Sequence, residues 1–324
     1  MLHTSELAIH YSRIPAQVKA HFKLDKAEEI DYFEADIRTC NFLGRDEAGN
    51  YAFAHKSFME FFAACRLHRL MLEDKATANG PVRINEEIRQ FLTGLFAVQP
   101  KPEPGSPYPP PEGFVWVPPG EFILGGEYGL DVQVAKLKQG FFAARTPVTN
   151  VQYAHFVAET QHKPPKHWKG KRPPKELVDH PVVYVAWEDA VAYAKWAKAR
   201  LPAEQEWEKA ARGYDGREYP WGEWAAGRCN TDEAGIARTT SVGQFSPDGD
   251  SPYGVQDAAG NVWEWTASTW ETGDESRRVL RGGAFYFNRS FARCACRGRY
   301  SPYFDWPNFG FRIVVSPISP TSAL

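Results

Sequence analysis

The residues best suited to chemistry lie near the carboxyl end of the chain, between Arg278 and Val314. Cys294 and Cys296 occur there, and cysteine thiolates are nucleophiles and metal ligands. If this segment is a strand, residues two apart share one face, and two cysteines so placed are poorly oriented for a disulfide bond. The chain has five cysteines without metal-ligand spacing, which fits a reducing compartment, so we expect a cytoplasmic protein.

The same segment mixes Tyr, Phe and Trp with Asn, Ser, Asp, Gly and Arg. Rigid aromatic side chains beside small polar ones are the composition of a binding surface such as an antibody paratope. Gly282 and Gly283 precede this mixture and a β-branched run at 313–315 follows it, so we expect strands on both sides. Four aromatic residues interleaved with Pro, Ser and Asp are predicted to form an exposed patch: Tyr300, Tyr303, Phe304 and Trp306.

Several motifs, in chain order, resemble the formylglycine-generating-enzyme family, a branch of the C-type-lectin fold. They span roughly residues 113–316 and read PVTNVQYAHFV from Pro147, HPVVYVAWEDAVAYAKWA from His180, RLPAEQEWEKAARG from Arg200, YPWG from Tyr219, GNVWEW from Gly260 and RVLRGG from Arg278. The resemblance implies an α+β fold of the C-type-lectin-like (sulfatase-modifying-factor) type, loop-rich with small antiparallel sheets. The closing segment, RVLRGG…RSFARCACRGR…GFRIV, more narrowly resembles the variable region of a diversity-generating-retroelement variable protein.

The variable-protein resemblance implies a diversified ligand-binding function without catalysis, with a protein or other macromolecule as the ligand. In that family, reverse transcription randomises template adenines, mostly in Asn codons, which limits the amino acids reachable at variable positions. The residues that such codons can encode are Tyr286, Phe287, Asn288, Ser290, Phe291, Cys296, Gly298, Tyr300, Ser301, Tyr303, Phe304, Asp305, Trp306, Asn308 and Phe309. Of these, Trp306 is reached from an arginine codon and not from an Asn codon.

The residues between these positions are expected to be constant and to anchor the scaffold: Arg289, Arg293, Arg297, Arg299 and Pro302. Buried arginines need carboxylate or carbonyl partners, so we expect such partners here. Strand alternation along 292–300 would place Cys294, Cys296, Gly298 and Tyr300 on one face and the arginines on the other.

The enzymatic alternative is copper-dependent oxidation of a substrate cysteine, or iron-dependent sulfoxide synthesis, on the same fold. The family's oxidation depends on two cysteines after the double glycine, and counting from Gly283 the matching positions are Phe287 and Ala292. Neither side chain offers a thiolate, and the histidines show no metal-ligand spacing. We therefore expect no enzyme and no required cofactor. A third alternative is a fixed accessory module that binds without diversification.

One structural calcium site is implied by the resemblance. Asp257, Gly260, Val262 and Glu264 align with a calcium loop of the family. The two acidic residues would supply carboxylates and the other two backbone carbonyls, which are the hard oxygen ligands that calcium prefers. The alternative is that Asn261 and Glu264 only hydrogen-bond the loop backbone.

The elements that must position these residues fall into four parts. Residues 1–99 are predicted to be a mainly helical, winged-helix-like adaptor segment with a β-hairpin. The proline-rich stretch 100–112 is predicted to be a semi-rigid linker, or alternatively a ligand for proline-binding modules. The C-type-lectin-like domain is expected at 113–316, and a flexible tail at 317–324.

The amino-terminal segment carries helical patterns at 16–21, 28–39 and 56–70, and a hairpin that pairs 41–45 with 51–54. FAHKSFMEFFAACRL, from Phe53, resembles the end of the winged-helix part of NACHT-type NTPases, which implies a signalling or NTPase partner. The chain contains no GxxxxGK[ST] loop, so ATP hydrolysis is not expected.

Three helices are predicted in the second domain: one capped by Thr149 or Asn150, one over 187–199 and one over 203–212. Relatives carry Thr where Ala203 stands, so the third helix should start more weakly, by about 1 kcal/mol.

The net charge of −2 and the pI near 6.5 point to neither nucleic acid nor an anionic membrane as a partner. No apolar run is long enough to span a bilayer.

Overall fold

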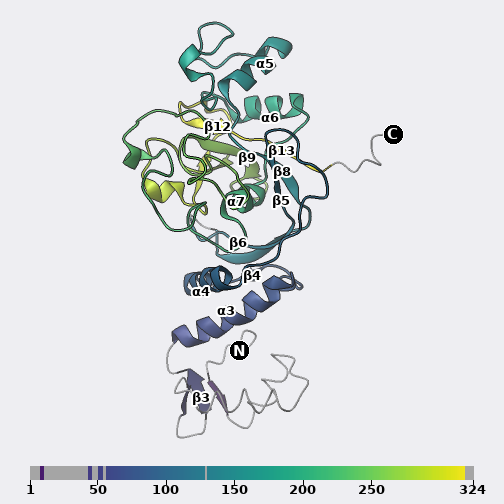
Figure 1. Ribbon diagram of the computed structural model, residues 1–324, viewed down its shortest axis with the longest axis vertical. Coiled ribbons are helices and arrows are strands. Elements are labelled where there is room, and N and C mark those ends of the chain that lie inside the picture. Colours follow the sequence, from purple (N-terminus) through teal and green to yellow (C-terminus); the bar gives the residue numbers. More distant parts are fainter. Residues whose placement is uncertain (1–7, 11–42, 46–49, 54–55, 128–129, 318–324) are drawn as a thin grey trace, which may run out of the picture.

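The computed structural model describes residues 8–10, 43–45, 50–53, 56–127 and 130–317 of the chain. Its amino-terminal part holds a three-stranded sheet in the order β1-β3-β2 (Figure 1). The strands are β1 (Ala8–His10), β2 (Leu43–Arg45) and β3 (Asn50–Phe53). β2 and β3 run antiparallel, so the predicted hairpin is confirmed. Its tip and the helices predicted at 16–21 and 28–39 lie outside the described residues.

Two helices, α3 (Lys56–Leu72) and α4 (Glu86–Val98), lie against the sheet that contains β6 (Figure 1). The helical pattern at 56–70 predicts α3, and no predicted element corresponds to α4. Asn85 caps α4, because its side-chain oxygen accepts a hydrogen bond from the N–H of Ile88 at 2.9 Å.

Both helices share one hydrophobic cluster with strands beyond the predicted linker. Met71 and Leu92, which are fully buried, pack in it together with Ile123 and Val134. The short strand β4 (Val82–Arg83) also pairs antiparallel with β7 (Gln133–Leu137), on the far side of the linker.

The proline-rich stretch 100–112 is held against the fold by its charged side chains. Lys101 is 5% exposed and its ammonium donates to the Asp74 carboxylate at 2.7 Å and to the Glu121 carbonyl at 3.0 Å. The Glu103 carboxylate accepts a hydrogen bond from the Tyr253 hydroxyl at 2.8 Å. The spacer expected from the prolines is therefore docked along part of its length.

Two small outer sheets flank the core. One has the order β13-β8-β5, and in the other β6 pairs with β7. The strands not yet placed are β5 (Phe114–Val117), β6 (Gly120–Leu124), β8 (Phe141–Ala144) and β13 (Val314–Val315). All pairs within these two sheets are antiparallel, as the predicted fold requires.

The three predicted helices of this part are present as α5 (Asn150–Thr160), α6 (Trp187–Trp196) and α7 (Glu204–Arg212). Thr149 caps α5 in a reciprocal pair of hydrogen bonds with Gln152. α6 ends before the predicted residue 199, where Lys198 has the left-handed φ of 54°.

The backbone N–H groups at the start of α7 have hydrogen-bond partners, although alanine stands at the capping position. Ala203 has no hydroxyl, but its N–H donates to the Glu206 carboxylate at 2.8 Å. The Ser268 hydroxyl, from another strand, accepts from the N–H of Glu204 at 2.9 Å. Ser268 thus accepts a hydrogen bond from the first turn of α7, which is part of what a threonine hydroxyl at position 203 would do.

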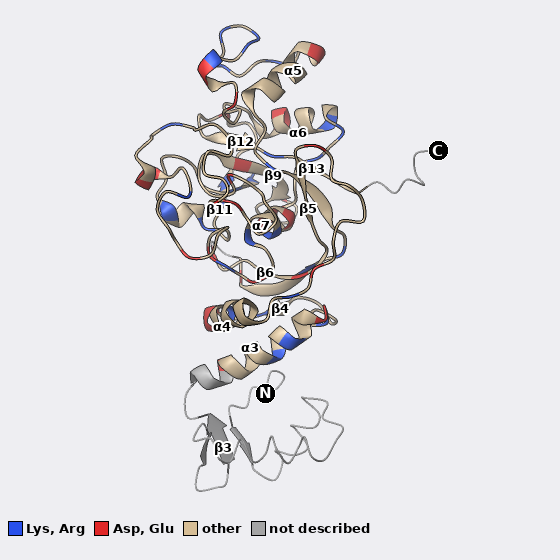
Figure 2. Ribbon diagram, viewed as in Figure 1, with Lys and Arg blue, Asp and Glu red and all other residues tan. Residues whose placement is uncertain are grey.

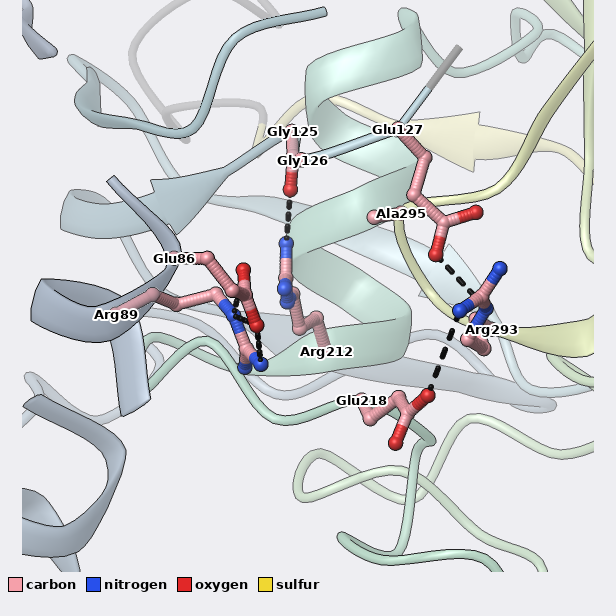
Figure 3. Close-up of a pocket in the computed structure, with 9 residues that line it drawn as sticks. All are labelled: Glu86, Arg89, Gly125, Gly126, Glu127, Arg212, Glu218, Arg293 and Ala295. Carbon is pink, nitrogen blue, oxygen red and sulfur yellow. Dashed lines mark hydrogen bonds and ion pairs between the residues drawn. The ribbon is translucent and has the colours of Figure 1, made fainter. Parts of the chain in front are cut away.

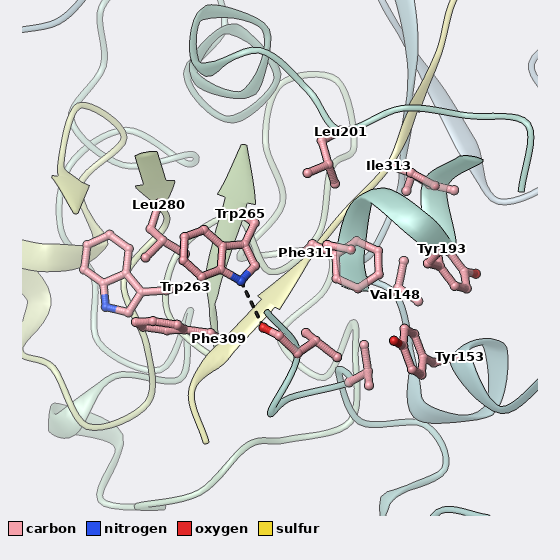
Figure 4. Close-up of a cluster of buried hydrophobic side chains, with 14 of the residues drawn as sticks. Val148, Tyr153, Tyr193, Leu201, Trp263, Trp265, Leu280, Phe309, Phe311 and Ile313 are labelled. Carbon is pink, nitrogen blue, oxygen red and sulfur yellow. Dashed lines mark hydrogen bonds between the residues drawn. The ribbon is translucent and has the colours of Figure 1, made fainter. Parts of the chain in front are cut away.

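A four-stranded sheet with the order β11-β10-β9-β12 forms the centre of the fold. Its strands are β9 (Trp263–Thr269), β10 (Arg278–Arg281), β11 (Arg297–Tyr300) and β12 (Phe309–Phe311). β12 runs parallel to β9, and the other pairs are antiparallel. Figure 4 shows the core that this sheet shares with α5 and α6, where the Trp265 indole donates to the Val185 carbonyl at 3.0 Å.

In the described residues from 130 onward, short 3-10 helices lie in the loops at Lys175–Leu177, Asp232–Ala234 and Arg289–Ala292. Within the described ranges, no helix is both long and apolar enough to cross a membrane.

Candidate functional site

The predicted variable stretch leaves β10 through a tight double-glycine turn. Gly283 has a φ of 73°, and a Cβ there would lie 2.7 Å from the carbonyl oxygen of Phe291. Only glycine fits this close approach without strain. The turn folds residues 284–296 back over the sheet before β11 begins.

Arg281 holds the end of that loop from inside the protein. Its guanidinium is fully buried and donates to three successive carbonyls, those of Cys294 at 2.8 Å, Ala295 at 2.8 Å and Cys296 at 3.0 Å. It also pairs with the buried Glu208 carboxylate. A buried charge with this many partners fixes the backbone geometry of the segment that leads into β11.

Helix α7 supplies the acidic partners of this network, and Figure 2 shows both signs of charge on it. Glu208 is also paired with Arg212 at 2.7 Å, and Glu204 receives two hydrogen bonds from Arg297 at 2.7 and 2.8 Å. Arg297 also lies over the Trp270 ring at 4.0 Å. The predicted carboxylate partner of a constant arginine is confirmed for Arg297.

The predicted strand over 292–300 is wrong in its first half. Arg289–Ala292 is a 3-10 helix and β11 begins only at Arg297. Because a turn separates them, Cys294 packs with Trp207, while Cys296 packs in the main core. Both cysteines are fully buried, and burial raises the pKa of Cys294 to about 12. In this conformation neither thiol is accessible for chemistry.

The residues of the predicted calcium site do not fit the ion. Glu264 is fully buried, and Arg312 donates to both of its carboxylate oxygens at 2.6 Å. The Trp207 indole adds a third hydrogen bond at 2.7 Å. This carboxylate is already neutralised, so Gly260 and Val262 lack the acidic partner that calcium would need beside them.

The other acidic residue of that loop, Asp257, lies near this ion pair, because the charge of Arg312 lowers its pKa and the charge of Glu264 raises it. Burial raises its pKa to about 6, against the opposing effect of the Gly243 N–H, which donates to it at 2.6 Å. The Asn261 side chain hydrogen-bonds the Thr240 backbone, as the alternative interpretation expects. Within the described part of the chain, no three His, Cys, Asp or Glu side chains are placed to hold a metal ion.

Five aromatic residues form what we call the aromatic patch: Tyr286, Tyr300, Tyr303, Phe304 and Trp306. Tyr303 is 75% exposed, and Tyr286, Phe304 and Trp306 are each at least 40% exposed. Tyr300 is half-buried and lies in ring contact with Phe304 and Trp306. Burial, and then the Tyr300 hydroxyl, raise the pKa of Tyr286, so these two residues are electrostatic neighbours.

Asn288 and Ser290 are also exposed, and Ser301 and Asp305 are half-buried. The Asn288 side chain accepts a hydrogen bond from the N–H of Ser290 at 3.0 Å. These polar positions can therefore contribute to the same surface.

The other predicted ligand-contacting residues lie inward. Cys296, Asn308 and Phe309 are at most 1% exposed, so their assignment as contact residues is corrected. Asn308 and Phe309 lead into β12, which runs beside β9 within the core. Phe287, Phe291 and Gly298 are half-buried against Trp263.

Two residues beside the patch have no signal in the sequence. Lys166 donates to the Asp305 carboxylate at 2.8 Å, although 139 positions separate them. Its ammonium lies 4.8 Å from the centre of the Tyr184 ring, and the N–H of Tyr184 donates to the Trp306 carbonyl at 3.0 Å. The loops that carry Lys166 and Tyr184 therefore hydrogen-bond the predicted variable stretch at Asp305 and Trp306.

A polar cavity of about 330 Å³ lies elsewhere, between α4, α7 and the segment that carries Arg293 (Figure 3). Its walls hold both signs of charge, and Arg293 bridges Glu127 at 2.8 Å and Glu218 at 3.7 Å. Arg89 is likewise paired with Glu86. Its charged walls are already paired with one another, which distinguishes it from the open aromatic patch.

Comparison with known proteins gives the family. Residues 100–317 match the family described as the Sulfatase-modifying factor enzyme 1-like domain. A formylglycine-generating enzyme of Thermomonospora curvata is 32% identical over an alignment that covers 66% of this chain and 96% of the relative. An inactive C-alpha-formylglycine-generating enzyme 2 of Bos taurus is 39% identical over 43% of this chain and 51% of the relative.

Among solved structures, Treponema denticola variable protein 1 superposes with a TM-score of 0.52 at 21% identity, covering 63% of this chain and 95% of that one. This likeness concerns the fold, and with the family match it confirms the predicted α+β, C-type-lectin-like class. The expectation that the chain is not an enzyme is corrected, because the family is one of sulfatase-modifying enzymes and curated relatives are named formylglycine-generating enzymes. The winged-helix NTPase resemblance stays a prediction.

Proposed function

The chain belongs to the sulfatase-modifying factor enzyme 1-like domain family, and from this premise we propose that it is a ligand-binding member of the diversity-generating-retroelement variable-protein kind. Its ligand is a protein or other macromolecule held at the aromatic patch. The constant scaffold positions the patch, and the side chains at 286–306 contact the ligand.

One observation carries this proposal. Among the described residues, the exposed large hydrophobic side chains outside this stretch are Phe61 and three valines, whereas Tyr286, Tyr303, Phe304 and Trp306 all belong to it. Exposed aromatic groups of this density mark interaction sites. Tyr and Trp are also the residues most enriched among those that dominate binding energy.

The buried ion pairs beneath the stretch favour binding by a preformed surface. Arg281 and Arg297 tie the backbone on both sides of β11's start to α7. A surface that is already ordered loses less conformational entropy when a ligand binds. We expect Tyr303→Ala, which removes the most exposed ring, to weaken ligand binding by about thirtyfold if it is a central anchor.

The flanking DNA tests diversification directly. We expect a reverse-transcriptase gene nearby and a template repeat almost identical to the codons for 286–309, with differences only at template adenines. Absence of both would refute the variable-protein assignment and leave a fixed binding module.

A display library tests binding separately. Only the exposed and half-buried positions of the stretch are randomised, and a matched library randomises the same number of exposed positions on α5 and α6. Selection against a test protein such as lysozyme should enrich binders from the first library alone, and equal enrichment from both would contradict a specialised surface.

Oxidation of a bound substrate is the second candidate, favoured by the names of the curated relatives. The positions that match the family's cysteines hold Phe287 and Ala292, so the residues there do not fit a copper–thiolate site. The test is incubation of the protein with a cysteine-containing peptide and copper, with aldehyde formation followed by mass spectrometry. Aldehyde formation well above a control with copper alone would support this candidate, and no excess over that control would refute it.

A further inference from the structure

We propose that the rings of Tyr300, Phe304 and Trp306 form a cup that binds the cationic end of a lysine or arginine side chain on a protein ligand. The inference rests on the proposed ligand-binding function and names the chemistry that the site selects.

The three rings are arranged as a nearly equilateral triangle. Their centroids are 6.2 Å apart for Tyr300 and Phe304, 6.0 Å for Tyr300 and Trp306, and 6.1 Å for Phe304 and Trp306. The ring planes are inclined to one another by 60°, 48° and 48° respectively. The three rings are therefore inclined to one another, unlike the parallel rings of a flat stack.

One side of the triangle is closed by a buried ring. Phe309 is 1% exposed, and it stacks on Trp306 at 6.0 Å with an interplanar angle of 19°. It also contacts Tyr300 edge-on at 4.9 Å. Because Phe309 covers the inner side, the exposed surface of Phe304 and Trp306 faces outward, where a ligand approaches.

The spacing suits a cation. A charge on the axis of such a triangle, about 4 Å above the plane of the centroids, lies about 5 Å from all three, within the roughly 6 Å range of cation–π attraction. A ring attracts the charge when its face is turned toward it, because the negative potential of the ring lies on its face. An uncharged alkyl end would gain only contact area at the same place.

The surrounding charges support the same occupant. Asp305 lies between Phe304 and Trp306 in the sequence, and its carboxylate forms a partly exposed pair with Lys166. The Lys166 ammonium is itself 4.8 Å from the Tyr184 ring, so this surface already stabilises one lysine by an aromatic face. A second cation at the cup therefore meets three rings beside a carboxylate that Lys166 already neutralises in part.

The experiment compares two tripeptides, acetyl-Gly-Lys-Gly-amide and the same peptide with norleucine, which has nearly the same hydrocarbon stem but no charge. Binding to the full chain is followed through the Trp306 indole N–H signal in NMR spectra, assigned with Trp306→Leu. We expect saturable binding of the lysine peptide and at least about fivefold weaker binding of the norleucine peptide. Equal affinities, or no saturable shift with either peptide, would overturn the cup.

Three variants separate the rings from other contributions. Phe304→Leu keeps apolar area but removes a ring, and should weaken the lysine peptide roughly threefold without affecting the norleucine peptide. Val98→Ala, at an exposed side chain of α4 outside the aromatic patch, should leave lysine binding unchanged. Asp305→Asn should keep most of the preference for lysine, and complete loss of that preference would assign it to the carboxylate and refute the role of the rings.

The outcomes also separate this inference from the proposed function. If norleucine binds as well as lysine while the display library still enriches binders, the cup is wrong and ligand binding stands. If lysine binds at the cup but the locus lacks a template repeat, the cup stands and diversification is wrong.

Discussion

Replacing Arg281 with methionine should be among the most destabilising single changes in this fold. The guanidinium is fully buried, pairs with Glu208 and donates to the carbonyls of residues 294–296. Breaking a buried ion pair from one side costs about 3–5 kcal/mol. Glu208 would keep Arg212 as a partner at 2.7 Å, so we take the lower limit for the pair, about 3 kcal/mol.

The carbonyls add to this cost. Each of the three buried carbonyls that loses its donor costs on the order of 1 kcal/mol, which brings the expected loss to about 6 kcal/mol. For a folded domain of about 200 residues, that loss lowers the unfolding midpoint temperature by roughly 12–24 °C. Hydrogen exchange of the amides in β11 should also accelerate, because the segment before it is no longer held.

Urea unfolding of the intact chain, followed by far-ultraviolet circular dichroism, measures the change. The matched control is Arg293→Met, the same substitution at a side chain that is 31% exposed and paired with Glu127, where we expect about 1 kcal/mol or less. If the free energies of unfolding of the two variants differ by less than about 1 kcal/mol, the role assigned to Arg281 is refuted.

Three further outcomes can be measured by the same unfolding experiment. Burial lowers the pKa of Lys209 to about 8. Between about pH 8 and 10.5 the unfolded chain therefore binds more protons than the folded chain, and the free energy of unfolding should rise with pH by about 3 kcal/mol. Lys209→Met should remove that rise. Burial raises the pKa of Asp257 to about 6. Between about pH 4 and 6 the folded chain therefore binds more protons than the unfolded chain, and the free energy of unfolding should fall by about 3 kcal/mol as the pH rises. An unchanged pH dependence in Asp257→Asn would contradict this. Ser268→Ala should cost about 1 kcal/mol because it removes the acceptor for the first turn of α7, whereas the exposed Ser276→Ala should cost almost nothing.

The sequence predicts α3, α5, α6 and α7 because their signals are local. The cap at Thr149 and the apolar positions of α5 are both readable from neighbouring residues. α4 carries such a signal too, in the cap Asn85 followed by Ile88, Leu92 and Phe96 at helical spacing. Those positions are the buried face of the helix, so the pattern could have identified it.

The site is less predictable, because its geometry depends on distant residues. Alternation along 292–300 suggests a continuous strand, but Arg281 draws three carbonyls inward and a turn results. Codon arguments identify which amino acids could vary without saying which are buried, and so they include Cys296 and Phe309. The contact of Lys166 with Asp305 connects loops that no sequence pattern joins.

The shared packing of α3 and α4 against β6 and β7 has a practical consequence for anyone who wants to reuse this protein as a recognition reagent. A chain that begins at the start of the matched family region would lack Met71 and Leu92. Ile123 and Val134 would then be exposed to water, which promotes aggregation. The helices lie on the far side of β6 from β12 (Figure 1), so a label fused ahead of α3 would lie away from β12.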